Sequence, residues 1–428
     1  MNKNKLKTYA PRARNDFVAA VKARAALLGI SEAGVSPATK TGDVVIVEGR
    51  EWPTKVGVQR ERLAGKIGKE GFEAIMDRVA YTWFNRFAAL RFMELHDYLG
   101  HGHRVLSNRE GGLPEILFHA GDVDLPGLNK AQVVELRLAG DRDGDLYRML
   151  LVAQCNALSV AMPFLFERID DESELLLPDN LLRTDSVIAK MVSSTDEEDW
   201  SEVEIIGWLY QYYISERKEQ VIGGVVKSED IPAATQLFTP NWVVKYLVQN
   251  SVGRLWLNAN PESSLRSKWR YYTEAQGQGE AALQAMAAAI QTRTDCDGGR
   301  LNPESITVLD PACGSGHILV EIYEILKDIY LERGYQPKSI PRLILEKNAF
   351  GLDIDDRAAQ LAGFALLMKA RADDRRLFSK TPVVHVRSLS DSKALPFDEI
   401  VGHLAPFGVD RGELTGLLAA FSEAKTLG

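Results

Sequence analysis

The residues best suited to chemistry in this chain form a short run of small and acidic side chains, Asp310-Pro311-Ala312-Cys313-Gly314-Ser315-Gly316. The run follows an apolar segment, residues 306–309. This order predicts a strand that ends, turns over small residues and gives way to a helix. Glycine at such a turn lets a ligand come close to the main chain at the carboxyl end of a parallel strand. We therefore expect a ligand-binding loop here.

A second acidic position falls where a nucleoside would need it. Asp353 lies at the tip of the next predicted strand, residues 349–352, where its carboxylate can accept hydrogen bonds from both hydroxyls of a ribose. Ile354 beside it is placed to cover one face of an adenine ring. The loop has neither the GxGxxG spacing of a dinucleotide site nor the Gly-Lys-Ser/Thr of a P-loop, which argues against NAD and nucleoside triphosphates.

A third element lies upstream of the loop. Phe238, Thr239 and Pro240 come directly before a predicted helix, residues 241–255. The Thr239 hydroxyl is a suitable N-cap, and Pro240 fits the first turn because it has no N–H to leave unpaired. The three elements follow one another in the order that a single nucleoside site would use.

The elements that must position these residues alternate from residue 306 onward. Apolar strands are predicted at residues 306–309, 349–352 and 382–386, with helices between them that include residues 358–371. Alternation of this kind predicts an α/β fold with a parallel sheet and right-handed crossovers.

The first half of the chain is instead mostly helical. It contains a short predicted strand at residues 44–47 and two aromatic-rich helices, at residues 72–98 and 203–219, of which the first is expected to be buried among other helices. We therefore divide the chain into a helical N-terminal domain, residues 1–230, and a ligand-binding domain, residues 231–428. An alanine-rich helix between glycine-containing flanks indicates a helical insertion in the second domain near residues 260–300.

Bulk composition narrows the class of protein. The 428 residues carry a net charge of −8, so any contact with nucleic acid must come from a local basic surface. Cys155, Cys296 and Cys313 have no metal-ligand spacing and are too few for a disulfide framework, which favours a reducing cytoplasm and no metal site. No apolar stretch is long enough to span a membrane. The sequence predicts a soluble, cytoplasmic protein.

One basic surface is visible near the N-terminus. Seven lysines and arginines occur among the first 24 residues, against the single acid Asp16. Phe17, Val21, Ala25 and Leu28 recur at helical spacing, so the segment predicts a basic amphipathic helix. Two interpretations remain open: a solvated surface helix, or an arm that contacts phosphates or docks a partner.

The loop and its two companions resemble the S-adenosylmethionine site of amino-group DNA methyltransferases. DPACGSG, with FTP upstream and GLDID downstream, is similar to the subgroup that places the cofactor motifs before the catalytic motif, over about residues 237–371. Residues 80–99 (AYTWFNRFAALRFMELHDYL) and 205–219 (IIGWLYQYYISERKE) resemble the helical N-terminal region of the large adenine-specific methyltransferases of BREX phage-defence systems, the PglX family. Similar segments occur in some fused restriction–modification enzymes.

The resemblance implies a mostly helical N-terminal region followed by a Rossmann-like class I methyltransferase parallel sheet. It also implies S-adenosylmethionine as cofactor, with double-stranded DNA and other phage-defence proteins as partners. In that family the FTP segment contacts the methionine end of the cofactor, the loop wraps the methionine and ribose, and the acidic residue holds the ribose. The cofactor-binding residues implied here are Phe238, Thr239, Pro240, Asp310, Pro311, Ala312, Cys313, Gly314, Ser315, Gly316, Asp353 and Ile354.

Two positions depart from the family pattern. The contact to the amino group of the cofactor adenine, usually an Asp after the third strand, stays open between Ser388 and Asp391. The catalytic Asn-Pro-Pro-Tyr/Phe, which holds the amine of a flipped adenine, is absent. The nearest similar segment, residues 397–407, imitates the strand of that motif and its final Pro-Phe but has no Asn and one proline, so we interpret it as a structural loop. We therefore assign no catalytic residue and expect an incomplete sheet, an inactive chain and a longer parent enzyme.

Three functions remain open at this point. The first is the N-terminal, cofactor-binding part of a site-specific DNA adenine methyltransferase that marks host DNA in phage defence. The second is a non-catalytic module that binds cofactor or DNA, or that scaffolds a defence complex. The third is methylation of RNA or of a protein glutamine by a related catalytic core.

Overall fold

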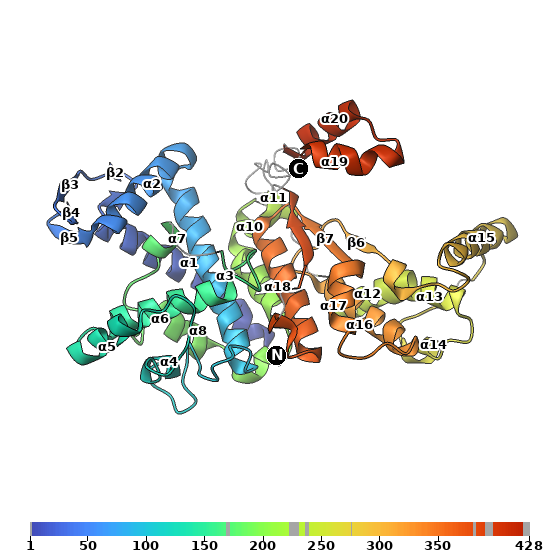
Figure 1. Ribbon diagram of the computed structural model, residues 1–428, viewed down its shortest axis with the longest axis horizontal. Helices are drawn as coiled ribbons and strands as arrows, with labels where there is room; N and C mark the ends of the chain where they lie inside the picture. Colours follow the sequence, from blue (N-terminus) through green and yellow to red (C-terminus); the bar gives the residue numbers. More distant parts are fainter. Residues whose placement is uncertain are drawn as a thin grey trace. The chain divides into compact units, whose positions relative to one another are not determined.

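The computed structural model describes residues 2–167, 172–221, 231–235, 239–274, 276–379, 382–389 and 397–422 (Figure 1). The chain divides into two units, Met1–Glu216 and Arg217–Gly428, and each is described by itself. Among the described residues, no helix combines the length and the apolar character needed to cross a membrane.

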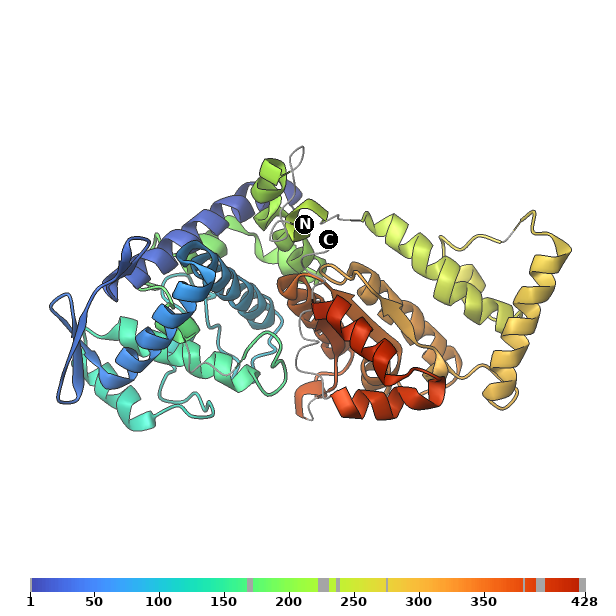
Figure 2. The same ribbon diagram turned by 90° about the horizontal axis from the view of Figure 1, so that it is seen from above.

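The core of the N-terminal unit lies between three helices, α1 (Lys3–Leu27), α3 (Phe72–Leu95) and α9 (Glu204–Tyr213), which contact one another (Figure 2). The ring of Phe17 on α1 meets Phe84 of α3 edge-on, with centroids 5.6 Å apart. Tyr81 of α3 makes an equivalent contact with Tyr213 of α9 at 4.9 Å. Aromatic side chains on all sides of α3 are buried, so the prediction of a helix enclosed by other helices is confirmed.

The basic face of α1 binds carboxylates of its own unit. Lys5 pairs with Asp196 at 2.6 Å, Lys22 with Glu73 at 2.6 Å and Arg24 with Asp179 at 3.0 Å. The opposite face of the helix is fully buried at Phe17 and Val21. Both faces are therefore engaged inside the unit, which favours a structural helix over an arm that contacts phosphates.

The other elements of this unit precede, link or follow these helices. The strand predicted at residues 44–47 is confirmed as the middle strand of an antiparallel sheet, in the order β3-β4-β5. The remaining elements are β1 (Ile30–Ser31), β2 (Gly34–Val35), β3 (Ala38–Thr41), β4 (Val44–Val47), β5 (Arg50–Pro53), α2 (Thr54–Glu70), α4 (Glu115–Phe118), α5 (Lys130–Ala139), α6 (Asp143–Leu158), α7 (Glu172–Leu175), α8 (Val187–Ser194) and η1 (Glu197–Ser201). Helix α10 (Ser215–Val221) begins in this unit and ends in the next.

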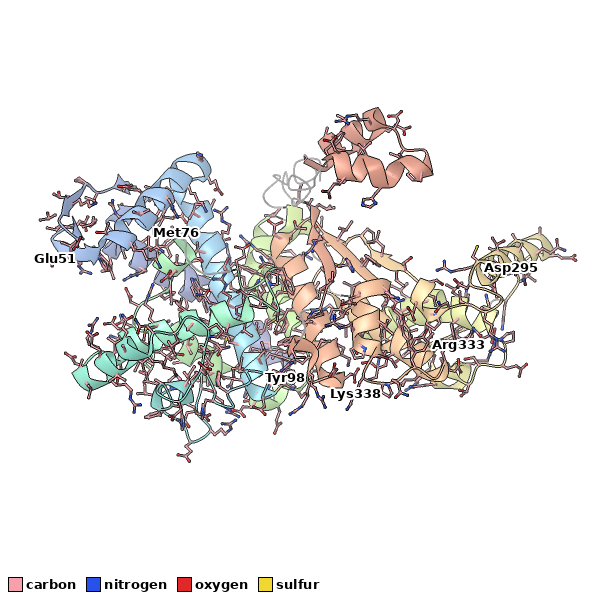
Figure 3. All side chains as sticks on the ribbon, viewed as in Figure 1. Glu51, Met76, Tyr98, Asp295, Arg333 and Lys338 are labelled. Atoms are coloured by element: carbon pink, nitrogen blue, oxygen red, sulfur yellow. The ribbon has the colours of Figure 1, made fainter. Side chains whose placement is uncertain are left out.

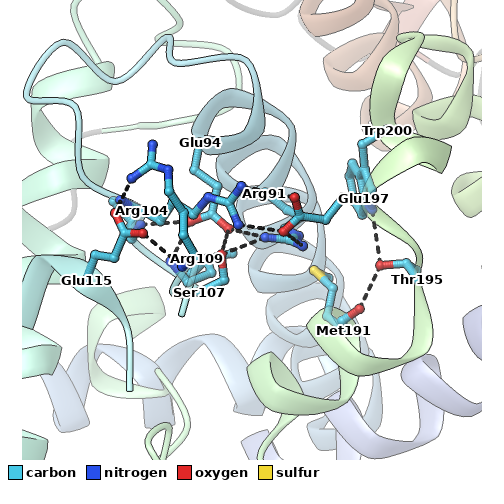
Figure 4. Close-up of polar contacts among 12 residues, drawn as sticks. Arg91, Glu94, Arg104, Ser107, Arg109, Glu115, Met191, Thr195, Glu197 and Trp200 are labelled. Atoms are coloured by element: carbon cyan, nitrogen blue, oxygen red, sulfur yellow. Dashed lines mark hydrogen bonds and ion pairs between the residues drawn. The ribbon is translucent and has the colours of Figure 1, made fainter. Parts of the chain in front are cut away.

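A buried carboxylate holds the loop that follows α3 (Figure 4). The Glu94 side chain is 0% exposed and pairs with Arg91, itself 1% exposed, at 2.6 Å. The same carboxylate accepts the main-chain N–H groups of Val105 and Leu106, both at 2.7 Å, and the hydroxyl of Ser107 at 2.8 Å. Four donors thus satisfy the buried carboxylate, and one of them, Arg91, is the buried charge of opposite sign.

The network extends from α3 to η1. Glu197 on η1 accepts hydrogen bonds from Arg104 and, at 3.4 Å, from Arg91 (Figure 4). Glu115 at the start of α4 accepts the main-chain N–H of Arg104 at 3.0 Å and that of Arg109 at 2.9 Å. One chain of charged groups therefore joins α3, the loop after it, α4 and η1.

Three histidines stack beside this loop. The rings of His103 and His119 are 3.8 Å apart and nearly parallel, at 6°, and His101 lies 5.8 Å from His103. Burial, followed by the charge of His119, lowers the pKa of His103, and burial lowers the pKa of His101. Parallel rings direct their in-plane nitrogens side by side and not toward one point, so this stack is unsuited to holding a metal ion.

We expect the stack to make stability depend on pH. The folded state keeps these pKa values below the ordinary value of about 6.5, so the unfolded chain binds more protons just below that pH. The free energy of unfolding should therefore fall as the pH drops from about 7.5 to about 5. His103→Phe keeps a flat ring that does not titrate, and it should flatten this dependence in urea-unfolding midpoints, whereas His403→Phe at an exposed position should not. If the pH dependence of unfolding is unchanged in His103→Phe, the histidine stack is not its cause.

The C-terminal unit contains the parallel sheet that the sequence predicts. Its three strands, β6 (Val308–Asp310), β7 (Ala349–Asp353) and β8 (His385–Ser388), are hydrogen-bonded in that order. The register pairs Asp310 with Gly351 and Asp353 with Ser388, so the carboxyl ends of the strands lie along one edge. Helices α16 (His317–Glu332) and α18 (Asp356–Asp373) connect the strands and contact the sheet. The α/β prediction is confirmed to this extent, while a complete Rossmann fold is not shown.

The remaining elements of this unit precede, link or follow the sheet. They are α11 (Ile231–Thr235), α12 (Asn241–Val248), the π-turn η3 (Gln249–Gly253), α13 (Arg254–Ala259), α14 (Leu265–Lys268), α15 (Glu280–Cys296), η4 (Pro303–Ser305), α17 (Ile340–Leu343), the π-turn η5 (Ile344–Asn348), η6 (Leu377–Ser379), α19 (Phe397–Leu404), η8 (Ala405–Phe407) and α20 (Arg411–Ser422). The interpretation of residues 397–407 as a structural loop is therefore wrong, because they form α19 and η8. Asp398 and Glu399 lie in the first turn of α19, where acidic side chains favour a helix.

The expected alanine-rich helix is α15, which projects from its unit in Figures 1 and 3 and has no buried residue. The segment before it is tied to α16: Trp256 and Ser263 donate to Glu332 at 2.7 and 2.8 Å. Arg333, labelled in Figure 3, donates to Asn260 at 3.0 Å and to the carbonyl of Leu301 at 3.1 Å. The two ends of the inserted segment are thus held at one point of the unit.

Candidate functional site

The loop after β6 has the backbone that its glycines predict. Gly314 and Gly316 have φ angles of +52° and +90°, a region that other residues rarely adopt. A Cβ atom at Gly316 would lie 2.8 Å from the Cα of Ala362, so α18 leaves room only for glycine. The N–H of Cys313 donates to the carbonyl of Leu352 at 2.9 Å, which fixes the loop to the end of β7.

Asp353 joins the tip of β7 to the loop. Its Oδ2 accepts the N–H of Gly314 at 2.7 Å, and its Oδ1 accepts the N–H of Asp355 at 2.8 Å. Only 7% of the residue is exposed, and burial raises the pKa of its carboxyl while these two N–H groups oppose the rise. The structure therefore places Asp353 beside the loop, as predicted, and adds a contact that the sequence did not reveal.

Two buried polar atoms at the loop lack a partner within the described part of the chain. Asp310 is 8% exposed, and its Oδ1 accepts the N–H of Ala312 at 3.2 Å, whereas its Oδ2 has no hydrogen bond. Ser315 is 4% exposed, and its Oγ likewise has none. Burial raises the pKa of Asp310. Buried polar groups are normally satisfied, so these atoms fit a site that a polar ligand completes.

The other loop residues have no reactive group available at neutral pH. Pro311 and Ala312 are exposed. Cys313 is 6% exposed, and burial, followed by the neighbouring Asp353 and Asp310, raises the pKa of its thiol, which stays protonated. Burial lowers the pKa of His317, the first residue of α16, to about 4, so its imidazole is neutral.

The upstream element is described only in part. Phe238 lies outside the described residues. The N-cap of α12 is Pro240, with φ −54° and ψ 140° and without a side-chain hydrogen bond, so the assignment of Thr239 as N-cap is wrong. Thr239 lies one residue earlier and is half-buried. Helix α12 packs against α16, the helix that follows the loop.

Sequence reasoning missed two residues that position the strands. Asn348 is 0% exposed; its amide donates to the carbonyls of Pro303 at 2.8 Å and Ile306 at 2.7 Å, and its oxygen accepts the hydroxyl of Tyr330 at 2.9 Å. It thereby aligns β6, β7 and α16. Gly351 in β7 has no space for a side chain, because a Cβ atom there would lie 2.8 Å from the Cδ1 of Leu319. The available signal for Gly351 was a glycine inside a predicted strand. Nothing in the local sequence marks Asn348.

Comparison with known proteins adds two relatives, although no protein-family model matches the chain. The chain is 54% identical over 402 residues to the adenine-specific methyltransferase BrxX of Escherichia coli O9:H4 (strain HS). The matched region covers 92% of this chain and 33% of BrxX. It is 35% identical over 467 residues to the adenine-specific methyltransferase PglX of Lacticaseibacillus casei (strain Zhang). That matched region covers 100% of this chain and 37% of PglX. The chain spans about a third of the length of these curated relatives, and its resemblance to one portion of the PglX-type proteins is confirmed.

Proposed function

We propose that this chain, similar to adenine-specific methyltransferases over nearly its whole length, is the N-terminal, cofactor-binding portion of a DNA adenine methyltransferase. The cofactor is S-adenosylmethionine, held by the loop at residues 310–316 together with Asp353. The observation that carries the proposal is the pair of buried atoms, Asp310 Oδ2 and Ser315 Oγ, that lack partners in the described part of the chain. They lie at a loop whose main chain only glycine can form, at residue 316.

The chemical types of these residues fit that cofactor. The Asp353 carboxylate can accept further hydrogen bonds from ribose hydroxyls, since each of its oxygens has more than one lone pair. Asp310 and Ser315 offer oxygen acceptors to an ammonium group. The two carboxylates give the site a negative field that favours a cationic ligand. When bound, the cofactor supplies an electrophilic methyl group on a positively charged sulfur.

The ionisation states at the loop suit such a ligand. The neutral imidazole of His317 adds no positive charge that would repel a sulfonium. The protonated thiol of Cys313 is a weak nucleophile, because the thiolate is the reactive form. The loop therefore can hold a methyl donor without taking the methyl group itself.

The target base is the part of the reaction that this chain does not explain. Its sequence contains no Asn-Pro-Pro-Tyr/Phe. We propose that the rest of a longer protein holds the flipped adenine while this chain holds the cofactor, so that the amine and the methyl group meet in line. Double-stranded DNA as partner, host marking in phage defence and a cytoplasmic location belong to this proposal.

A scaffold without catalysis is the second candidate. The N-terminal unit, residues 1–216, accounts for half of the chain, and its buried charges serve internal packing. Such a helical body suits the docking of other defence proteins or of DNA. Cofactor binding is common to both candidates, so only methyl transfer separates them.

The deciding experiment uses a polypeptide in which this chain continues to the length of its relatives. It is incubated with tritiated S-adenosylmethionine and unmethylated phage DNA, and the digested nucleosides are separated. We expect label in N6-methyladenine. We also expect a loss of at least about tenfold in Gly316→Ala, since the added Cβ displaces the loop from Ala362.

Three other results would each reject the proposal in a different way. Label in RNA or in protein glutamine would indicate a different substrate. Cofactor binding without any transfer would favour the scaffold. Unchanged labelling in Gly316→Ala would show that the cofactor lies elsewhere.

A further inference from the structure

The strand order predicts which element meets the far end of a bound nucleoside. The carboxyl ends of β6, β7 and β8 lie side by side, and Asp353 is in register with Ser388. Neighbouring strands are about 4.8 Å apart, so the distance from the loop after β6 to the end of β8 is roughly 10 Å. A nucleoside that begins at the loop and places its ribose on Asp353 therefore directs its base toward the end of β8.

The group held at the end of β8 is a carboxylate from another element. Ser388 is 7% exposed, and its hydroxyl donates a hydrogen bond to Oδ1 of Asp356. Asp356 lies in the first turn of α18, after Asp355, whose side chain caps the helix by accepting the N–H of Arg357 at 3.1 Å. A helix N-terminus favours a carboxylate in its ionised form. The side chain of Asp356, at the start of α18, is thus tied to the end of β8.

Ser388 and Asp356 have different hydrogen-bonding roles. The single hydroxyl proton of Ser388 is used on Asp356. An ionised carboxylate is a pure acceptor with about four lone-pair positions, more than the one that the hydroxyl of Ser388 uses. An acceptor without donors selects an exocyclic amino group and disfavours a keto oxygen at the same position. The orphaned Asp310 Oδ2 and Ser315 Oγ lie on the same sheet edge, at the loop after β6 where the ligand would begin.

We infer that Asp356, positioned by Ser388, is the acceptor that recognises the amino group of the bound adenine, in place of an acidic residue on the strand itself. The inference rests on the proposed cofactor site. Asp391, the alternative left open by the sequence, lies outside the described residues. The two alternatives make different predictions for single variants of each residue.

The test compares two ligands that differ only at this amino group, S-adenosylhomocysteine and S-inosylhomocysteine, in which a keto oxygen replaces it. We expect the unmodified chain to bind the adenosyl compound about tenfold more tightly or better, as for one hydrogen bond to a charged group. Asp356→Ala should reduce this preference to about twofold or less. Ser388→Ala, which leaves the carboxylate but removes its anchor, should give an intermediate preference.

A matched control is Asp374→Ala, with the same loss of charge at the opposite end of α18, about 27 Å along the helix; it should keep the full preference. Asp356→Asn, nearly isosteric, serves if the alanine variant does not fold, and it should weaken the preference because an amide also presents donors.

A preference unchanged in Asp356→Ala, or abolished by Asp391→Ala alone, overturns the inference while leaving the cofactor site intact. Binding of neither ligand by the unmodified chain rejects the proposed function and this inference together.

Discussion

Asp353→Ala is expected to weaken binding of S-adenosylmethionine by about a hundredfold or more. Two hydrogen bonds from ribose hydroxyls to a carboxylate correspond to about 1.5–3 kcal/mol each, and every 1.4 kcal/mol is about tenfold in affinity. The variant also frees the N–H of Gly314, which Asp353 holds at 2.7 Å, so the loop loses part of its preorganisation. Calorimetric titration of the variant beside the unmodified chain measures the effect.

Its control must separate lost contacts from lost structure. Asp373, at the other end of α18, accepts hydrogen bonds from Tyr323 at 2.8 Å and Lys327 at 2.6 Å. Asp373→Ala therefore removes a carboxylate with two partners in the same unit, and it should bind the cofactor almost as the unmodified chain does. Equal weakening in both variants would mean that Asp353 acts only through stability, and an unaffected Asp353→Ala would remove it from the site.

The second large effect is expected in the N-terminal unit. Glu94→Ala leaves the guanidinium of Arg91, 1% exposed, without its buried partner, and it also frees the N–H groups of Val105 and Leu106. Breaking a buried pair from one side costs about 3–5 kcal/mol. Glu94→Gln keeps the shape of the side chain and one acceptor oxygen, so it should reduce the free energy of unfolding by less than Glu94→Ala does.

Hydrogen exchange of peptides from residues 98–118, with urea-unfolding midpoints, measures this loss locally. The matched control is Glu70→Ala, which breaks a surface pair with Arg78 whose side chains are 42% and 46% exposed. That change should cost less than about 1 kcal/mol. Similar exchange in Glu94→Ala and Glu70→Ala would contradict the role assigned to the buried network.

Local chemistry made the binding loop predictable. Its glycines at 314 and 316 have the positive φ angles that the small-residue run requires, and Asp353 ends a strand where the apolar pattern stops. Two of the strands begin two or three residues after their predicted starts, and the apolar pattern did not mark burial there, since Leu309 is 57% and Val383 is 48% exposed. The parallel direction of the strands followed from the alternation of strands and helices, whereas the strand order and the register became visible only in the structure.

The errors have specific physical causes. Thr239 was expected to cap α12, but the extended backbone of Pro240 occupies that position. The helix predicted at residues 241–255 is confirmed, but the sequence did not reveal its π-helical segment, Gln249–Gly253, where the Gln249 side chain accepts the N–H of Tyr271 at 2.8 Å. Contacts such as these join residues far apart in the sequence. The pairing of Asp356 with Ser388 is of the same kind, and no local pattern could have revealed it.

The most direct test of the central claim locates the cofactor on this chain by hydrogen exchange. Peptides covering residues 310–320 and 349–357 are compared with and without S-adenosylmethionine. We predict slower exchange of both segments on addition of the cofactor, and no change in peptides from residues 2–167. Unchanged exchange at the loop under saturating cofactor, or protection confined to other segments, would contradict the assignment of this loop and Asp353 as the site.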